Sequence, residues 1–163
     1  MPLDTSVATA EQEWMRQAVR LATSSVQNGG GPFGALIARD GEIVATGTNL
    51  VTKSLDPTAH AEVTAIRNAC KTLGTFKLDG CVLVTSCEPC PMCMASALWA
   101  RLGSVLYAAN RDDAAVAGFD DRAFYDLFTD PEAEWPTPVR RVDFDNRTEP
   151  FDAWRDKTDR IDY

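Results

Sequence analysis

The single histidine of this chain constrains the possible fold more than any other feature of the sequence. His60 stands two residues before Glu62, and the cysteines Cys90 and Cys93 follow later, in a Pro-Cys-Pro-Met-Cys segment. One imidazole nitrogen and two sulfurs are ligands that suit Zn²⁺. Three protein ligands leave the fourth tetrahedral position for a water molecule, which is typical of a catalytic zinc site. The fold is therefore expected to bring His60, Cys90 and Cys93 together.

Both halves of this pattern stand at the start of a predicted helix. Apolar residues recur with helical spacing over 61–73, and Gly74 is suited to end that helix. A second helix is predicted over 91–101, with Pro91 near its first turn, where a missing N–H costs little. The partial positive charge at a helix N-terminus favours the thiolate form of cysteine, and a bound metal deprotonates a ligating thiol outright.

Alternatives to this interpretation exist for two residues. Cys87 lies three residues before Cys90, so a closed Cys₃His structural site without water is a rival arrangement. We disfavour it because Cys87 falls at the end of a predicted strand, whereas Cys90 and Cys93 share one helical turn. Glu62 could be an ordinary exposed helix residue. Two residues after a ligand, however, it can reach past the metal to the water and carry protons.

The composition indicates one globular α/β domain that covers residues 1–163. The chain is long enough for one core, its residues are 45% hydrophobic and 25% charged, and no repeat or linker interrupts it. No apolar run approaches the length of a membrane span, and the first residues lack the pattern of a secretory signal. The five cysteines are an odd number, which favours reduced thiols, with Cys70 and Cys81 as small core residues. We therefore expect a cytoplasmic protein.

The charge balance weighs against a polynucleotide substrate. The formal net charge is -8 and the sequence pI is about 4.6. Proteins that bind a nucleic-acid phosphate backbone need a basic surface, because their affinity comes from neutralising the phosphates. A free base or a nucleoside is the better expectation.

The order of predicted elements begins with a helix that a capping box at 9–12 opens and that runs to about Val26. A strand–helix–strand unit with short links is expected to form a right-handed parallel crossover. Hairpin strands are predicted at 33–39 and 42–47 around a type I′ turn, further strands at 81–86, 104–108 and 139–144, and further helices at 112–117, 123–128 and from 150.

Four segments resemble the bacterial guanine deaminases of the cytidine-deaminase-like superfamily. His-x-Glu followed by Pro-Cys-x-x-Cys is the signature of zinc-dependent nucleobase deaminases. The preference for guanine rests on Asn49, the Gly-Phe-Asp-Asp segment and the C-terminal Tyr163. The four segments are 31–35, 56–62, 85–93 and 117–121, and the resemblance extends over nearly the whole chain.

This resemblance implies a three-layer α/β fold with a central five-stranded mixed sheet flanked by helices, and usually a homodimer. In some members the C-terminal segment, here 145–163, crosses to the partner subunit and covers its active site. The implied reaction is the zinc-dependent hydrolysis of guanine, a small purine base, to xanthine and ammonia, with Glu62 as the proton shuttle. Guanosine or a triazine is the alternative substrate. A tRNA adenosine deaminase is disfavoured by the acidic charge, and a non-catalytic zinc scaffold by the presence of Glu62.

The same resemblance implies several substrate contacts. Asn49 would hydrogen-bond the base, although most loop asparagines are simply turn residues. Asp121 would be a second carboxylate near the leaving amine, although it or Asp120 could equally be a solvated acid or a helix cap. The backbone N–H groups of Ala61 and Cys90 would lie near the site.

Three aromatic residues are candidates to cover the base. Phe33 follows the glycine-rich loop, and Trp99 lies on the helix that carries the cysteines. Each could stack on a flat ring or belong to the core. Tyr163 would ordinarily be a frayed end, but an aromatic side chain beside the terminal carboxylate could close a pocket over a base.

Overall fold

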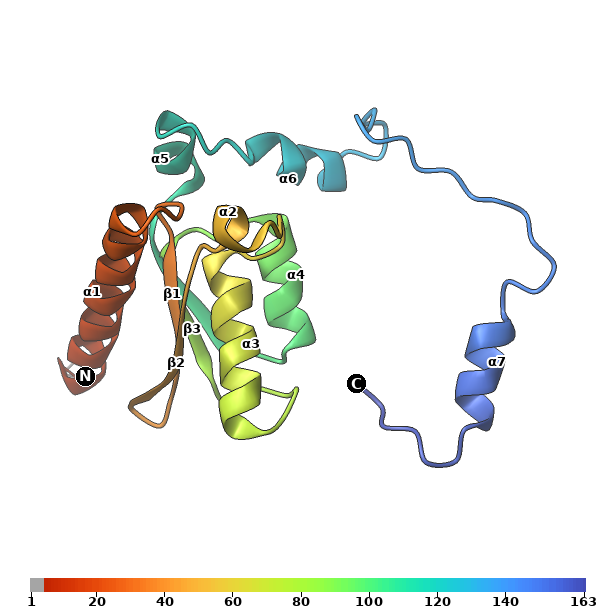
Figure 1. The fold of residues 1–163 in the computed structure, drawn as a ribbon, viewed down its shortest axis with the longest axis horizontal. Helices are drawn as coiled ribbons and strands as arrows, with labels where there is room; N and C mark the ends of the chain where they lie inside the picture. The colour runs from red at the N-terminus through yellow and green to blue at the C-terminus, as the bar shows by residue number, and fades with distance from the viewer. Residues whose placement is uncertain (1–4) are drawn as a thin grey trace.

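A four-stranded mixed sheet forms the centre of the molecule in the computed structural model, which describes residues 5–163 (Figure 1). The strand order is β2-β1-β3-β4. Strand β1 (Gly34–Arg39) pairs antiparallel with both β2 (Glu42–Thr48) and β3 (Val82–Cys87). Strand β3 pairs in parallel with β4 (Ser104–Ala109), as expected for a strand–helix–strand crossover.

Helices cover both faces of this sheet. Helix α1 (Thr5–Gln27) packs on one face, where Ala18 contacts Leu36 and Val84 in a small buried cluster. Helices α3 (Ala61–Leu73) and α4 (Pro91–Trp99) pack on the opposite face over a larger buried cluster. The expected three-layer α/β architecture is therefore confirmed (Figure 1).

The local signals in the sequence are largely reproduced. Asp40 and Gly41 have φ values of 52° and 86°, as a type I′ hairpin turn requires. Gly74 ends α3 in the left-handed conformation. The first helix differs from the prediction, because α1 begins at Thr5, ahead of the expected capping box. A short helix, α2 (Val51–Ser54), also lies between β2 and α3, where no helix is predicted from the sequence.

Close packing between β2 and α3 positions the first turn of that helix. A Cβ atom at Gly47 would lie only 2.4 Å from the carbonyl oxygen of Ala61 and 2.4 Å from the backbone nitrogen of Ala65. The absence of a side chain at Gly47 thus allows α3 to lie directly on the strand. This contact fixes the end of the helix that carries His60 and Glu62.

Residues 139–144 do not form the fifth strand that the sequence predicts. Within the described residues, the outer edge of β4 has no partner strand, and the sheet has four strands. Val139, Val142 and Phe144 are exposed by 82%, 63% and 63%. The apolar–polar alternation identified residues suited to a strand, but a strand also requires a neighbouring edge, and the chain directs this segment away from the sheet (Figure 1).

The chain after β4 forms short helices and then a long arm. Helices α5 (Arg111–Val116) and α6 (Arg122–Thr129) lie above the sheet, and α7 (Glu149–Asp156) stands apart from it (Figure 1). We call residues 130–163 the C-terminal arm. All of its residues are exposed except Ala133, which is half-buried. No helix among the described residues is long and apolar enough to cross a membrane.

Candidate metal and substrate site

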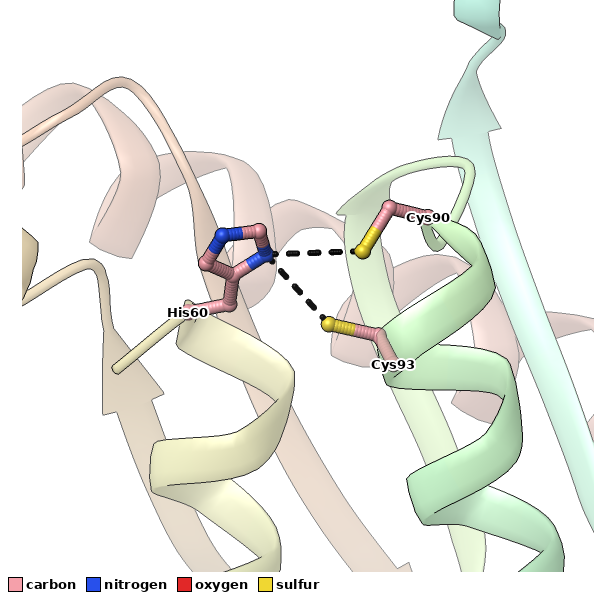
Figure 2. A group of neighbouring side chains, drawn as sticks. All are labelled: His60, Cys90 and Cys93. Carbon is pink, nitrogen blue, oxygen red and sulfur yellow. Dashed lines mark hydrogen bonds between the residues drawn. The ribbon is translucent and has the colours of Figure 1, made fainter. Parts of the chain in front are cut away.

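The three predicted metal ligands converge at the N-terminal ends of two helices (Figure 2). His60 is the N-cap of α3, Cys90 is the N-cap of α4, and Cys93 lies in the first turn of α4. Nδ1 of His60 lies 3.6 Å from Sγ of Cys90 and 3.5 Å from Sγ of Cys93. The three donor atoms all lie within 4.8 Å of one another, as the ligands of a single ion must.

The protonation chemistry of this group fits a zinc ion. Hydrogen bonds with Cys93 and His60 lower the pKa of Cys90 to about 4. The hydrogen bond with Cys90, together with burial, raises the pKa of Cys93. The hydrogen bond with Cys90 also raises the pKa of His60. Cys90 thus readily loses its proton beside an imidazole nitrogen, and a bound Zn²⁺ would deprotonate Cys93 as well, which would give one nitrogen and two thiolate ligands.

Cys87 stands outside this group. Its thiol lies 3.8 Å from the carbonyl oxygen of Asn110 and donates to it. Burial raises the pKa of Cys87 to about 11, so the thiol keeps its proton. The structure thus places Cys87 at the end of β3, as the sequence indicated, and gives no support to the closed Cys₃His arrangement.

Glu62 lies in the first turn of α3, immediately beside the cysteine ligands. Its side chain is buried, with 5% of the residue exposed, and burial raises the pKa of the carboxyl group. The hydroxyl of Thr85 donates to Oε1 at 3.2 Å, and the Cys93 thiol donates to Oε2 at 3.5 Å. A buried carboxyl group of raised pKa beside a metal site is suited to take up and release a proton.

A cavity of about 630 Å³ opens onto this group. A cavity of this size can take a flat heterocycle together with some water. Among the residues that line it are Phe33, Asn49, His60, Glu62, Cys90 and Asp121, all of which are sequence candidates.

Asn49 is held in a fixed orientation at the cavity. It is 9% exposed, and its Oδ1 accepts a hydrogen bond from the backbone N–H of Val51 at 3.2 Å. Gly31 lies against its side chain, since a Cβ atom on Gly31 would come within 3.1 to 3.4 Å of the carboxamide atoms. With Oδ1 bonded in this way, Nδ2 is the atom that is left to donate to a ligand.

Phe33 packs edge-on against Phe119 at the cavity wall. Their ring centroids are 5.0 Å apart and their planes are at 88°. Phe119 belongs to the Gly-Phe-Asp-Asp segment and lines the cavity, although it is not among the aromatic residues predicted to cover the base. The pair gives the cavity an aromatic surface suited to a planar base.

The two neighbouring acids Asp120 and Asp121 have different environments. Asp120 pairs with Arg122, with Oδ2 and Nη2 2.7 Å apart, and hydrogen bonds from Arg122 lower its pKa to about 2. Asp121 has a buried Oδ1 that finds no hydrogen-bond partner among residues 5–163, and burial raises the pKa of its carboxyl group. An unsatisfied buried oxygen at a cavity wall points to a ligand that supplies the missing donor.

Two of the predicted substrate residues lie away from this cavity in the single chain. Trp99, at the end of α4, is 64% exposed, and Tyr163 is 73% exposed. The two rings lie 6.2 Å apart, and Tyr163 also approaches Phe76 and Trp154. Trp99 does not line the cavity of its own chain, because it lies at the end of α4 opposite the cysteines.

Ala61 lies at the site by its backbone alone. It is fully buried as the first residue of α3, directly after His60. The backbone N–H groups in the first turn of a helix have no partner within the helix, so they can face a bound ligand.

A polar cluster that the sequence did not reveal supports the cysteine loop. The carboxylate of Glu88 pairs with Arg111, with Oε2 and Nη2 2.8 Å apart, and also accepts from the backbone N–H of Arg111 at 3.0 Å. The Arg111 guanidinium lies 3.6 Å from the centre of the Tyr125 ring. The Tyr125 hydroxyl donates to the carbonyl oxygen of Pro89, next to Cys90. We call Glu88, Arg111 and Tyr125 the loop brace.

Comparison with known proteins defines the class to which this fold and site belong. Residues 8–109 match the family described as the cytidine and deoxycytidylate deaminase zinc-binding region. The chain belongs to this family, and the expectation of zinc as its cofactor is confirmed.

Individual proteins and solved structures within and around this family show more specific similarities. The chain is 51% identical over 153 residues to the guanine deaminase of Bacillus subtilis, covering 93% of this chain and 98% of that protein. The X-ray structure of guanine deaminase from Bacillus subtilis superposes with a TM-score of 0.90 over the same shares. A structure of NE0047 in complex with 2,6-diaminopurine has a TM-score of 0.66 at 35% identity, covering 68% of this chain and 62% of that chain. The tRNA-specific adenosine deaminase of Aquifex aeolicus is 38% identical over 99 residues, which are 61% of this chain and 66% of that protein.

Proposed function

We propose that this protein catalyses the hydrolytic deamination of guanine to xanthine and ammonia. The observation that carries the proposal is the 51% identity to a guanine deaminase over 93% of this chain. That share is too large to leave out most of the C-terminal arm, whereas the match to a tRNA adenosine deaminase covers 61% of the chain. The net charge of -8 also favours a small purine over a nucleic acid.

Glu62 would carry the protons of the reaction. Zinc, held by His60, Cys90 and Cys93, supplies the Lewis acidity that activates water when it is bound. Glu62 transfers both protons of the attacking water in turn, the first to a ring nitrogen and the second to the departing amine. Its burial and its place between the metal ligands and the cavity support this role.

Asn49, Asp121 and the aromatic wall would orient the base. Nδ2 of Asn49 can donate to an acceptor on the purine, because Oδ1 is already bonded to Val51. The unpartnered oxygen of Asp121 can accept from the amino group that leaves. Phe33 can pack against the face or edge of the ring, together with Phe119.

We further propose that the protein acts as a cytoplasmic homodimer in which residues 145–163 cover the active site of the partner subunit. Tyr163 lies outside the cavity of its own chain, and the arm exposes Phe151, Ile161 and Tyr163 by 64%, 69% and 73%. Apolar surface of this kind is expected to be covered in the assembled protein. The unpaired edge of β4 offers a second surface on which a partner's arm can dock. Five free thiols are consistent with a reducing compartment.

Ammonia release from a panel of bases tests the proposed activity. The purified zinc protein is incubated with guanine, guanosine, adenine, cytosine and ammeline, and the Glu62→Gln variant serves as the control. We expect guanine to be strongly preferred. The variant should retain zinc but lose roughly 10²–10⁴-fold in activity, the usual contribution of general acid–base catalysis. Equal turnover of guanosine, or normal turnover by the variant, would contradict the proposed substrate or the proposed role of Glu62, respectively.

A further inference from the structure

We propose that Thr85 is a positioning residue for the deamination, because its hydroxyl group fixes the carboxylate of Glu62. The inference rests on the proposed function, in which Glu62 carries the protons. Neither the metal ligands nor the residues proposed to bind the base include Thr85.

The hydroxyl of Thr85 lies in an otherwise apolar part of the core. Thr85 is fully buried in β3, between Ala35 of β1 and Tyr107 of β4. The strand residues before it are Val82, Leu83 and Val84. A buried hydroxyl group destabilises the folded state unless it is hydrogen-bonded, so the position of this group requires a partner.

Glu62 is that partner. The Thr85 hydroxyl donates to Oε1 of Glu62 at 3.2 Å, joining residues 23 apart in sequence. Because side chains alternate along a strand, Thr85 points to the same face as Leu83, which packs in the cluster that includes Ala61. The hydrogen bond thus links the middle of the sheet to the first turn of α3.

This bond assigns different positions to the two carboxylate oxygens. Oε1 is bonded to Thr85, while Oε2 lies 3.5 Å from Sγ of Cys93, a metal ligand. Holding Oε1 in the core leaves Oε2 on the side of the metal ligands, where a reacting water would have to be reached. Proton transfer requires the carboxylate within hydrogen-bond reach of the water, so its rotation has to be restricted.

Packing alone does not require threonine at this position. Valine has nearly the same shape and would fill the same space in a strand of Val and Leu residues, whereas serine would retain the hydroxyl. The two substitutions therefore separate the volume of the side chain from its hydrogen bond.

The test compares Thr85→Val and Thr85→Ser, with Ser86→Ala as a matched control. Ser86 is the neighbouring buried hydroxyl, 8% exposed, and it accepts from the backbone N–H of Gly34 at 3.2 Å rather than contacting Glu62. For each variant, zinc content, Tm, kcat and KM for guanine are measured. Crystal structures of the Thr85 variants give the orientation of the Glu62 carboxylate.

We expect Thr85→Val to bind zinc, to keep its KM for guanine and to lose roughly 10- to 100-fold in kcat, as for a lost hydrogen bond to a charged group. Its Glu62 carboxylate should be rotated from the position seen in Thr85→Ser, which should retain most of the activity. Ser86→Ala should lower Tm without a comparable loss of kcat.

A double-mutant cycle with Glu62→Gln distinguishes positioning from a general structural effect. If Thr85 acts through Glu62, Thr85→Val should cause little further loss in the Glu62→Gln background. A Thr85→Val enzyme with unchanged kcat, or a full additional loss in that background, would overturn the proposal. If the unmodified protein deaminates another base of the panel, the proposed substrate is wrong. The same cycle on that base then still decides the role of Thr85.

Discussion

At the scale of single residues, the thiols near the metal group differ in what they can do. Cys90 has a pKa lowered to about 4 by its hydrogen bonds, while burial raises the pKa of Cys87 to about 11. Cys90 and Cys93 also lie together with His60 at the metal group, whereas the Cys87 thiol donates to the carbonyl oxygen of Asn110. Within one segment, Cys90 is thus placed to bind a metal ion, while Cys87 is a buried residue outside the metal group.

We therefore predict opposite outcomes for two alanine substitutions. Cys90→Ala should abolish both zinc binding and activity, because it leaves only His60 and Cys93 as ligands. Cys87→Ala should keep zinc at one ion per chain and retain most of the activity. Metal analysis of the purified proteins, together with ammonia release, checks both outcomes. Loss of zinc from Cys87→Ala would instead support the closed Cys₃His site.

At the scale of secondary-structure elements, the loop brace holds α5 and α6 against the loop that ends at Cys90. Glu88 is 15% exposed in its ion pair with Arg111, so the pair is shielded more than an ordinary surface salt bridge. The Tyr125 hydroxyl completes the contact by donating to the carbonyl oxygen of Pro89. Asp121 is the N-cap of α6 and lines the cavity, so the element that carries it is joined to the cysteine loop by this contact.

The variant Tyr125→Phe tests this element contact. It keeps the aromatic ring beneath Arg111 but removes the hydroxyl, so the free energy of unfolding should fall by about 0.5–1.5 kcal/mol. Zinc should also pass more quickly to a competing chelator, because the loop before Cys90 is less restrained. Thr129→Ala is the control, since the Thr129 hydroxyl bonds only to backbone oxygens of α6. Identical rates of zinc release in both variants would show that the brace does not support the metal loop.

The sequence predicted those elements and contacts that depend on local patterns. The hairpin around Asp40 and Gly41, the end of α3 at Gly74 and the grouping of His60 with the cysteines follow from turn chemistry, capping and ligand types. Each of these signals lies within a few neighbouring residues, or in residue types with few alternative uses.

The contacts that could not be predicted join residues that are distant in sequence and of types common in any fold. Nothing in the sequence distinguishes Thr85 from other strand threonines, because its role depends on where α3 places Glu62. Trp99 is a candidate to stack on the base, but it lies at the end of α4 opposite the cysteines and does not line the cavity of its own chain. Residues 139–144 alternate apolar and polar residues as a strand does. A strand also needs a neighbouring sheet edge to pair with, and the chain does not place this segment beside the edge of β4.

At the scale of the whole molecule, the C-terminal arm is the feature that a single chain does not explain. Tyr163 ends near Trp99 rather than at the cavity, and the cavity of the same chain lies beyond its reach in this arrangement. If the arm closes the partner's site, it excludes water and orients the base.

Deleting Asp162 and Tyr163 should then lower guanine turnover at least about tenfold, with zinc content and Tm nearly unchanged. An ordinary frayed terminus would tolerate the deletion.

A mixed dimer decides whether the arm acts on its own chain or on the partner. One chain carries Glu62→Gln with an intact arm, and the other keeps Glu62 but lacks Asp162 and Tyr163. With different affinity tags, co-expression and two purification steps isolate the mixed dimer. If the arms are exchanged, the site with Glu62 receives the intact Tyr163 of the other chain, and activity should return to about half that of the unmodified dimer, since one of two sites is complete. If each arm serves its own chain, both sites are defective, and the mixed dimer should be no more active than the two variants measured separately.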